Sequence, residues 1–407
     1  NTFISLAGYS SFAMLGLAPV IVQFASHEWA HLGESPDGTV AGNNDAHARL
    51  ASLARMIRSW FLTAGLVILL GLGIGGTMFF KNSADAAPMS VWLAPWLTMC
   101  LLLSINFFAI PFYYLLQGCG RVKAVFTFRF IQGIIGHITI WTAVYAGADL
   151  WTYCFFYLAN ITCAAIFLVY LNGRLLKSIF GKIVSAVTLH WREVLPMQWR
   201  VTVVSFCSYF MFQLFTQSSM YFSGPERAAQ MGNTWNAILL LGAVMGAFLG
   251  PKMPQLGMYV ARGQTDLLDK LFFKAYAVSA AFLVTGGTAM WLVIAALNTF
   301  DFHLADYFAR RFLAPLPTAL FLAAFITYTL YTALGQYFIA QKKLPHFPVI
   351  ILATILTAGA IWYTGPRYGV VGTGIALLAV HLCMAPVMLG VWHRAKRTFH
   401  SSSPDSH

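Results

Sequence analysis

Runs of about twenty apolar residues recur along the whole chain, and they limit its fold more than any other feature of the sequence. An α-helix needs about 20 such residues to cross the hydrocarbon core of a bilayer. Transmembrane strands give shorter segments of alternating hydrophobicity, so the pattern excludes a β-barrel. Only 9% of the residues are charged, whereas a soluble domain has about 25%. The sequence therefore predicts an all-α integral membrane protein.

Eleven of these runs are predicted to be membrane-spanning helices. In chain order they lie at about 3–24, 57–80, 92–117, 124–146, 151–171, 199–222, 231–251, 272–297, 312–340, 345–364 and 370–392. The six cysteines are scattered, nearly all of them inside these runs, and no C-x-x-C occurs. This pattern is typical of small packing residues, so we expect no disulfide framework, no thiolate metal site and no cofactor.

The basic residues are divided unevenly between alternate connections of the predicted helices. Twenty of the 25 Lys and Arg lie in one set, which comprises residues 25–58, 118–129, 172–200, 250–274, 341–346 and the tail from 393. The positive-inside rule places this set, and with it the C-terminus, in the cytoplasm. The net charge of +12 is thus a signal of topology, and we expect no nucleic-acid partner. Asn1 is then outside; since the chain has no initial Met and no signal peptide, we expect a further helix to precede it.

Short motifs recur between the two halves of the chain. The matches are Leu17, Pro19 and Gln23 with Leu249, Pro251 and Gln255 (offset 232), Gly75–Thr77 with Gly286–Thr288 (offset 211), and Ile140–Trp141 with Ile361–Trp362 (offset 221). Repeats of this kind in membrane proteins often reflect duplicated bundles. We therefore predict two pseudo-symmetric bundles of six helices in parallel orientation, with the first helix of the first bundle missing from this sequence.

The two predicted bundles are joined by a basic linker. The predicted domains are an N-terminal bundle at 1–172, the linker at 173–197, a C-terminal bundle at 198–393 and a tail at 394–407. Apolar pairs recur about every four residues from Leu175 to Val187, with Arg174, Lys177 and Lys182 among them. This pattern predicts an amphipathic helix at the cytoplasmic surface of the membrane.

Four stretches of sequence carry a family resemblance. They are "GYSSFAMLGLAPVIVQFAS" from Gly8, "LLQGCGRVKAVF" ending at Phe126, "EVLPMQWR" ending at Arg200 and "GPERAAQMGNTW" from Gly224. With the two bundles and the linker, they make the chain similar to the polysaccharide flippases of the multidrug/oligosaccharidyl-lipid/polysaccharide (MOP) superfamily. The resemblance covers essentially the whole chain, and its motifs are diffuse.

The resemblance implies two six-helix bundles around a central cavity that opens alternately to each side of the bacterial inner membrane. The implied cargo is an oligosaccharide on an undecaprenyl pyrophosphate carrier, as used for O-antigen and related surface polysaccharides. The implied partners are this lipid-linked oligosaccharide and membrane lipids, together with a polysaccharide polymerase and glycosyltransferases. We therefore expect a transporter and not an enzyme.

A pyrophosphate calls for cationic side chains near the cytoplasmic mouth of such a cavity. Arg129 is the main candidate, because a guanidinium several residues inside the fourth span should face a polar cavity. Further candidates are Arg58, Arg200 and Lys252 near the cytoplasmic ends of their spans, and His137 within the fourth span. The alternative is that the cations only extend to the interface and that His137 is a hydrogen-bonded packing residue.

Sugar hydroxyls call for a polar and aromatic wall. Tyr209, Gln213 and Gln217 share one face of the predicted span at 199–222, and Asn233 and Asn236 follow on the next span. Polar side chains are costly against lipid, so this face should line the cavity or a helix contact. The alternative is that these amides only bridge neighbouring helices.

The 13 acidic residues all lie outside the predicted spans. Cation-coupled drug exporters of the same superfamily generally bind Na⁺ or H⁺ with a membrane-embedded carboxylate. The lack of one in the predicted spans favours an anionic, lipid-linked cargo over a cationic drug. A drug or small-solute exporter of the same fold is the alternative.

One motif points to a different class of function. Residues His27–His31 read HEWAH and match the H-E-x-x-H of zinc metalloproteases. No later predicted span has a carboxylate to act as third ligand, and the residues at offset 232, Tyr259 to Gly263, include no ligand. We therefore expect Glu28 and both histidines to be solvated or interfacial and Trp29 to be an interface anchor. A membrane metalloprotease stays as a remote alternative.

Overall fold

The structure is a computed structural model that describes residue 14 and residues 16–81, 88–181, 191–300 and 309–401. Within these ranges, only the backbone is described for residues 79, 209, 210, 212–223, 225, 228 and 399–401. The described chain is helical apart from one two-stranded hairpin, turns and short connections, which confirms the all-α class. It divides into two compact units, residues 1–198 and residues 199–407, called unit 1 and unit 2 below.

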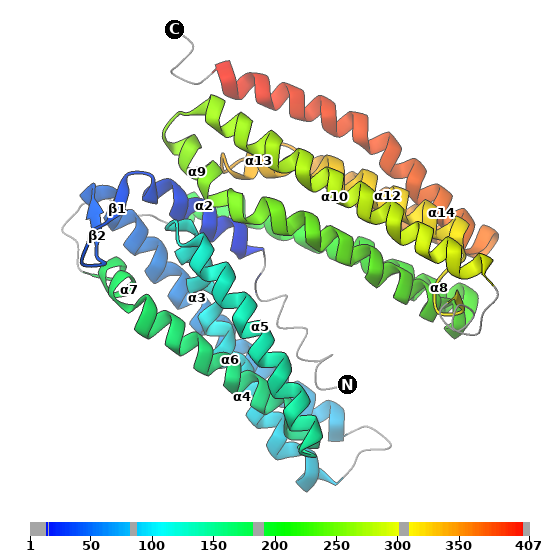
Figure 1. The fold of residues 1–407 in the computed structure, drawn as a ribbon, viewed down its shortest axis with the longest axis horizontal. Helices are drawn as coiled ribbons and strands as arrows, with labels where there is room; N and C mark the ends of the chain where they lie inside the picture. The colour runs from blue at the N-terminus through cyan, green and yellow to red at the C-terminus, as the bar shows by residue number, and fades with distance from the viewer. Residues whose placement is uncertain (1–13, 15, 82–87, 182–190, 301–308, 402–407) are drawn as a thin grey trace. The chain divides into compact units, whose positions relative to one another are not determined.

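Unit 1 is built around helix α4. Its elements in chain order are α2 (Leu17–Trp29), β1 (Leu32–Glu34), β2 (Val40–Gly42), α3 (Asn44–Lys81), α4 (Met89–Gly118), α5 (Val122–Tyr145), η2 (Asp149–Trp151), α6 (Thr152–Ala165), the π-helical segment η3 (Ile166–Leu171) and α7 (Gly173–Ile179) (Figure 1). Helix α4 packs against α2, α3, α5 and α6. Trp96 and Met99 of α4 are completely buried, and Ile21 of α2 and Phe61 of α3 are at most 1% exposed. The core of the unit therefore surrounds α4.

Unit 2 contains two long helical stretches that are each interrupted by a glycine. Its elements are α8 (Trp191–Leu249, whose first residues belong to unit 1), η4 (Gly250–Lys252), α9 (Met253–Ala261), α10 (Thr265–Thr299), α12 (Pro315–Ala333), α13 (Gly335–Ile339) and α14 (Phe347–Ser401). Gly224 in α8 (φ 84°, ψ 176°) and Gly369 in α14 (φ 59°, ψ −151°) have non-helical torsions, so each stretch consists of two helices. Helix α12 packs against α10 and α14.

Eight helices among the described residues are long and apolar enough to cross a membrane. They cover nine of the eleven predicted spans. The span at 3–24 lies largely outside the described residues, and the side chains of most of the span at 199–222 do too. The spans at 345–364 and 370–392 form one helical stretch, Phe347–Thr398, broken at Gly369.

The connection predicted at 25–58 is more ordered than the sequence suggested. Within this connection β1 and β2 form an antiparallel hairpin, and α3 begins at Asn44, well before the span predicted to start at residue 57. The side-chain oxygen of Asn43 accepts the backbone N–H groups of Asp45 (2.8 Å) and Ala46 (3.3 Å) and so caps the helix. Leu50 and Leu53 are at most 1% exposed, which shows that this early part of α3 packs inside unit 1.

The described part of the predicted linker packs on unit 1. In α7, Leu175 and Ile179 are buried. The Ser178 hydroxyl accepts the backbone N–H of Val40 in the hairpin (2.9 Å), and the Ser178 carbonyl accepts His47 Nε2 of α3 (3.1 Å). The apolar face therefore contacts protein where the sequence predicted membrane surface. Residues 182–190 of the linker lie outside the described residues.

Candidate functional site

Unit 2 contains a cavity of about 350 Å³. Its wall is mostly apolar and comes from α8, η4, α9, α12, α13, the turn before α14 and the start of α14. Its polar side chains are Ser208, Tyr328, Thr329, Thr332, Gln336 and His346. A cavity with an apolar wall and a few convergent polar groups is the usual form of a site for a small molecule or for part of a larger one.

Glycines of α8 leave the space for this cavity. The double G-x-x-x-G of Gly242, Gly246 and Gly250 predicts a helix-packing seam. A Cβ on Gly242 would lie 2.6 Å from the Phe325 ring, so a seam is present there. A Cβ on Gly246 or Gly250 would meet no atom within 4 Å, and both residues line the cavity, so the prediction is wrong for these two.

Hydrogen-bonded tyrosines form part of the wall and the layer behind it. The hydroxyl groups of Ser208 and Tyr328 are 3.0 Å apart, and the Tyr331 hydroxyl lies 3.1 Å from Nδ1 of His381. The Tyr328 ring also lies 5.2 Å from the His381 ring and 5.6 Å from the Tyr331 ring. Uncharged hydroxyls thus dominate this side of the cavity.

His346, in the turn before α14, is the most unusual residue of the cavity. It is 3% exposed, and its imidazole lies against Gly335, where a Cβ would come within 2.6 Å of the ring. Nδ1 of His346 has no hydrogen-bond partner among the described residues. Burial lowers the pKa of His346 to about 4, so the ring is neutral near pH 7. A neutral imidazole has one donor and one acceptor nitrogen, and Nδ1 of His346 is buried.

The four cations predicted to bind pyrophosphate are all exposed. The guanidinium of Arg129 lies 5.8 Å from the centre of the Tyr113 ring, that of Arg58 lies 5.4 Å from Phe180, and that of Arg200 lies 5.6 Å from Trp199. Lys252 is exposed at the end of η4. None of the four lines the cavity of unit 2. Cation–π contacts hold the arginines in place while their N–H groups stay available.

The predicted polar wall is described only in part. The side chains of Tyr209, Gln213 and Gln217 lie outside the described residues. Asn233 donates to the carbonyl of Arg311 (3.0 Å), and Asn236 is exposed. Two neighbours of Asn233 also form hydrogen bonds with the backbone of the segment before α12. Gln230 donates to the Arg310 carbonyl (3.1 Å), and the Thr234 hydroxyl accepts the Leu313 N–H (2.9 Å). Asn233 thus belongs to a group that fastens the segment before α12 to α8.

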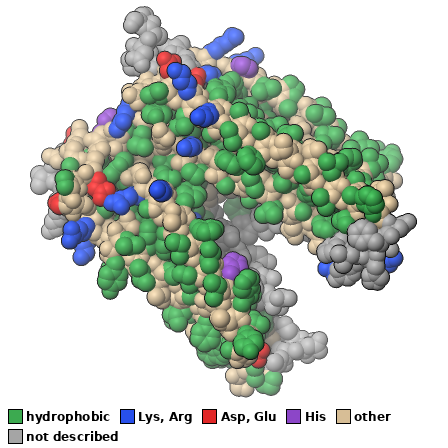
Figure 2. Space-filling model, viewed as in Figure 1, with side chains coloured by type: hydrophobic (Ala, Val, Ile, Leu, Met, Phe, Trp, Pro, Cys, Tyr) green, Lys and Arg blue, Asp and Glu red, His purple; other side chains and the backbone are tan. Residues whose placement is uncertain are grey.

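His137 is exposed on α5, and its Nδ1 donates to the Gly133 carbonyl of its own helix at 2.8 Å. The side of α5 that carries it also has exposed apolar residues such as Ile134, Ile138 and Trp141. Figure 2 shows hydrophobic side chains along the length of unit 1, with Lys and Arg gathered near the β1–β2 hairpin. This distribution is that of a bundle with lipid around its middle and a polar interface at that end.

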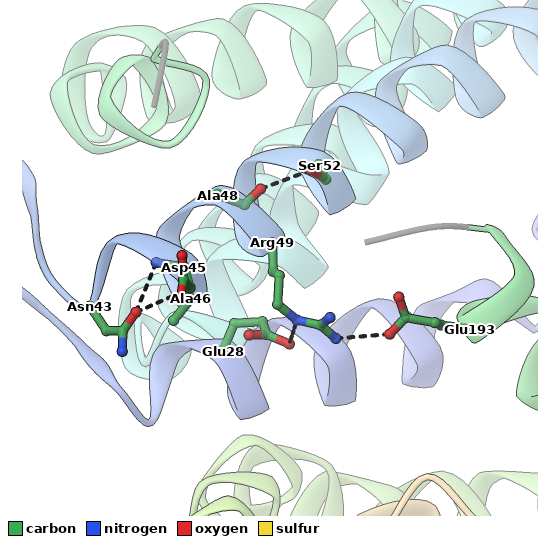
Figure 3. Close-up of polar contacts among 8 residues, drawn as sticks. All are labelled: Glu28, Asn43, Asp45, Ala46, Ala48, Arg49, Ser52 and Glu193. Carbon is green, nitrogen blue, oxygen red and sulfur yellow. Dashed lines mark hydrogen bonds and ion pairs between the residues drawn. The ribbon is translucent and has the colours of Figure 1, made fainter. Parts of the chain in front are cut away.

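A charged cluster that joins three helices of unit 1 was not predicted. Arg49 of α3 lies between two carboxylates, with Nε 3.0 Å from Oε1 of Glu28 and one terminal nitrogen 2.9 Å from Oε2 of Glu193 (Figure 3). Glu28 lies in the last turn of α2 and Glu193 in the first turn of α8, so one guanidinium joins three helices. These residues are 21 and 144 positions from Arg49. No local pattern in the sequence signals so distant a pairing.

This cluster changes the interpretation of the HEWAH motif. Glu28 is 7% exposed and ion-paired, where we expected it to be solvated, and Trp29 is 8% exposed, where we expected an interface anchor. Helix α2 ends at Trp29, so His31 lies in the following turn, off the helix that H-E-x-x-H requires. Among the residues that the structure describes, no three His, Cys, Asp or Glu side chains are placed to hold a metal ion. The structure therefore gives the metalloprotease hypothesis no support.

No family model matches the sequence. No curated protein matches it either. Solved structures do match its fold. A mutant of the Vibrio cholerae MATE transporter VcmN is 12% identical with a TM-score of 0.74, over 98% of this chain and 88% of that chain. An outward-facing multidrug resistance MATE family transporter of the MOP superfamily is 12% identical with a TM-score of 0.65, over 99% and 89%.

A third match is a MOP superfamily transporter from Pyrococcus furiosus, described as having a binding pocket of reverse polarity that suggests a different function. It is 13% identical with a TM-score of 0.61, over 98% of this chain and 88% of that chain. All three likenesses extend over both units. Across nearly its whole length, the chain therefore has the fold of the MATE transporters of the MOP superfamily.

Proposed function

We propose that this protein flips an oligosaccharide linked to undecaprenyl pyrophosphate from the cytoplasmic to the periplasmic leaflet by alternating access. The fold supports transport across a membrane, and the sequence resemblance supports the lipid-linked cargo. In this proposal the protein acts in the bacterial inner membrane, beside the glycosyltransferases and polymerase of a surface polysaccharide pathway.

The distribution of charge along the spans is the observation that carries this proposal. In the eight candidate spans, no Asp or Glu lies beyond the fifth residue of a span. Arg129, by contrast, is the eighth residue of the span Val122–Tyr145, about 10 Å along the helix. Its side chain is exposed and stacked on Tyr113, with no carboxylate bonded to it among the described residues. An anionic headgroup is attracted to such a position, whereas a cationic drug is repelled by it.

The cavity of unit 2 supports the sugar part of the proposal. Its polar groups are hydroxyls, an amide and a neutral imidazole, and Tyr328 contributes an aromatic ring. Uncharged donors and acceptors beside an aromatic ring suit a carbohydrate, whose own polar groups are mainly hydroxyls. A charged ligand would leave its charge without a counter-charge in this wall.

A drug or small-solute exporter is the second candidate, because MATE transporters, one of them described as a multidrug resistance transporter, are among the similar structures. The two candidates differ in the sign of the charge that they bind. Purified protein in vesicles can be tested against both a fluorescent lipid-linked oligosaccharide and a cationic dye.

The decisive variant is Arg129→Ala, with Arg129→Lys as the conservative change and Arg394→Ala as a matched control at an exposed arginine of α14. We expect Arg129→Ala to abolish flipping at normal expression, Arg129→Lys to retain part of it, and Arg394→Ala to retain all of it. Normal flipping by Arg129→Ala would contradict the proposal. Dye export without oligosaccharide flipping would favour the second candidate.

A further inference from the structure

A long groove runs along the surface of unit 1 between α5 and the α6–η3 stretch. Its volume is about 680 Å³. One wall follows a single face of α5, and the other comes from α6 and the π-helical segment. The lining residues are Gly120, Arg121, Lys123, Ala124, Thr127, Phe128, Ile131, Ile135, Cys163, Ile166, Phe167 and Leu171. Apart from the two cations, Thr127 and Cys163, the groove presents only carbon side chains.

Aromatic rings form the base of the groove and exposed aliphatic residues form its rims. The rings of Phe128 and Phe167 stack at 4.2 Å with an angle of 9° between their planes, and Phe167 is 3% exposed. Ile131 and Ile166 are 49% and 50% exposed. The groove is therefore a stable feature of the packed helices whose open side needs an apolar occupant.

The two cations lie at one end of the groove, where the chain turns from α4 into α5. Arg121 is ion-paired with Glu34 of β1, through both its Nε and a terminal nitrogen, so its charge is compensated. Lys123 is exposed, and no carboxylate pairs with it among the described residues. The first turn of α5 has no side-chain cap, so its N–H groups add to the positive potential at this end. The groove thus ends in one uncompensated positive charge.

We propose that this groove binds an anionic phospholipid of the surrounding leaflet, with one acyl chain along α5 and the phosphate on Lys123. The groove runs from Lys123 to Ile135, about 18 Å along the helix. Half of a bilayer's hydrocarbon core is about 15 Å thick, so the groove spans one leaflet. Basic residues where a groove between helices meets the interface are a recurrent site for anionic lipid headgroups.

Charge and length favour a bilayer phospholipid over the polyprenyl carrier of the proposed cargo. A phosphodiester brings one negative charge, which matches the single uncompensated charge of Lys123. A pyrophosphate brings more charge than this end of the groove can neutralise. An undecaprenyl chain is also much longer than one leaflet, so most of it would lie beyond Ile135. The proposal does not depend on the proposed function.

The test is native mass spectrometry of the full-length chain, titrated with phosphatidylglycerol, with phosphatidylcholine of the same acyl chains, or with undecaprenyl phosphate. We expect phosphatidylglycerol to bind more tightly than phosphatidylcholine. Lys123→Gln should lower the affinity for phosphatidylglycerol about fivefold, the effect of one lysine near a charged headgroup. Lys270→Gln, at an exposed lysine of α10 outside the groove, should leave it unchanged.

A second variant and a second measurement locate the acyl chain. Ile131→Trp fills the groove at an exposed apolar position, so it should weaken both phospholipids without lowering the melting temperature. In hydrogen exchange, phosphatidylglycerol should protect segments 120–135 and 163–171. Equal affinity for the two phospholipids, unchanged binding in Lys123→Gln, or tighter binding of undecaprenyl phosphate than of phosphatidylglycerol in this groove would each overturn the proposal.

Discussion

Each unit has a charged group that joins its helices at the end where most of its basic connections lie. The two groups differ in composition and burial. In unit 1, Arg49 bridges Glu28, which is 7% exposed, and Glu193. In unit 2, Asp269 of α10 accepts Lys396 of α14 at 2.6 Å and the Tyr337 hydroxyl of α13 at 2.7 Å. The side chains of Asp269 and Lys396 are 24% and 23% exposed. The carboxylate of Glu28 in unit 1 is thus buried, whereas that of Asp269 in unit 2 keeps partial contact with solvent.

The backbone at these ends is more alike than the charges are. After α4, Gly120 has a positive φ of 80° and the Arg121 N–H donates to the Leu116 carbonyl. After α13, Lys342 has a positive φ of 57° and the Lys343 N–H donates to the Phe338 carbonyl. The same helix-ending turn occurs in both units, at an offset of 222. These ends therefore share a backbone turn, whereas their ion pairs differ.

The largest difference between the units should appear when each cation is removed. Arg49→Ala leaves the buried Glu28 without this ion pair. Because the Arg49 side chain is itself 24% exposed, we expect a cost at the lower end of the range for buried pairs, about 3 kcal/mol. The free energy of unfolding, from SDS titration in mixed micelles, should fall by that amount. Adding Glu28→Gln should restore part of the loss. The comparison fails if Arg49→Ala is no worse than Lys396→Ala.

Glycine contacts should separate the units next. In unit 1, a Cβ on Gly118 would lie 2.4 Å from the Ala25 Cβ and 3.0 Å from the Val22 carbonyl, and this backbone cannot move cheaply. We expect Gly118→Ala to cost about 3 kcal/mol. In unit 2, Gly242→Ala meets only the tip of the Phe325 ring and should cost about 1 to 2 kcal/mol.

Gly246→Ala is the matched control for these glycines, since its Cβ enters the cavity and meets no atom within 4 Å. Its effect on the free energy of unfolding should stay within about 0.5 kcal/mol. Melting temperatures of the three variants give the same ranking. If Gly246→Ala were as harmful as Gly242→Ala, the α8 glycines would form a continuous seam after all.

The pH dependence of stability should be a property of unit 2. Burial lowers the pKa of His346 to about 4, below the ordinary value of 6.5. Because the folded state holds the neutral ring, its contribution is complete above pH 6.5 and is lost as the pH falls toward 4. At pH 5.5 the loss is about 1 kcal/mol. The residue of unit 1 at offset 221 is the buried Val125, which cannot titrate.

His346→Val places the residue of unit 1 in unit 2 and should abolish the part of the loss that comes from His346. The measurement is the free energy of unfolding at pH 7.5 and 5.5, for the wild type and the variant. An equal decrease in both proteins would show that another group is responsible.

The smallest effect is expected for the charge pair of unit 2. Lys396→Ala removes a partly exposed ion pair, and Asp269 keeps its hydrogen bond to Tyr337 and its contact with solvent. Such pairs contribute about 0.5 kcal/mol. SDS titration beside Arg49→Ala measures the contrast directly. A loss above about 2 kcal/mol would show that the cation–π contacts of Lys396 with Phe273 and Trp392 stabilise α14 strongly.

Most of the spans and the fold class could be predicted from the sequence, because a bilayer selects helices by length and hydropathy alone. The resemblance correctly indicated the fold of the MOP superfamily. The early start of α3 was missed because Asp45, Arg49 and Arg55 mark residues 44–57 as a polar loop by composition. The apolar spacing of Leu50, Leu53 and Ile57 was the available signal, and it indicates a buried helix.

The charged cluster and the cavity could not be predicted in the same way. The burial of Glu28 depends on its ion pair with Arg49, which also pairs with Glu193 from a distant part of the chain. Hydropathy carries no information on such pairing. The cavity depends on Gly246 and Gly250, where an added Cβ would meet no atom within 4 Å, and on His346, which packs against Gly335. The G-x-x-x-G pattern by itself is typical of a helix-packing seam. Both features arise from tertiary packing.

The glycine breaks in α8 and α14 have a consequence for the chirality of the chain. At Gly224 and Gly369, an added Cβ would meet no atom within 4 Å, so space does not restrict either position. The torsions do, since an L-residue at these angles costs about 1 to 3 kcal/mol. The mirror images of these torsions are ordinary extended backbone. D-alanine introduced by semisynthesis should therefore fit where L-alanine is strained. These two positions of unit 2 require glycine or a residue of D configuration, and the size of the side chain is secondary.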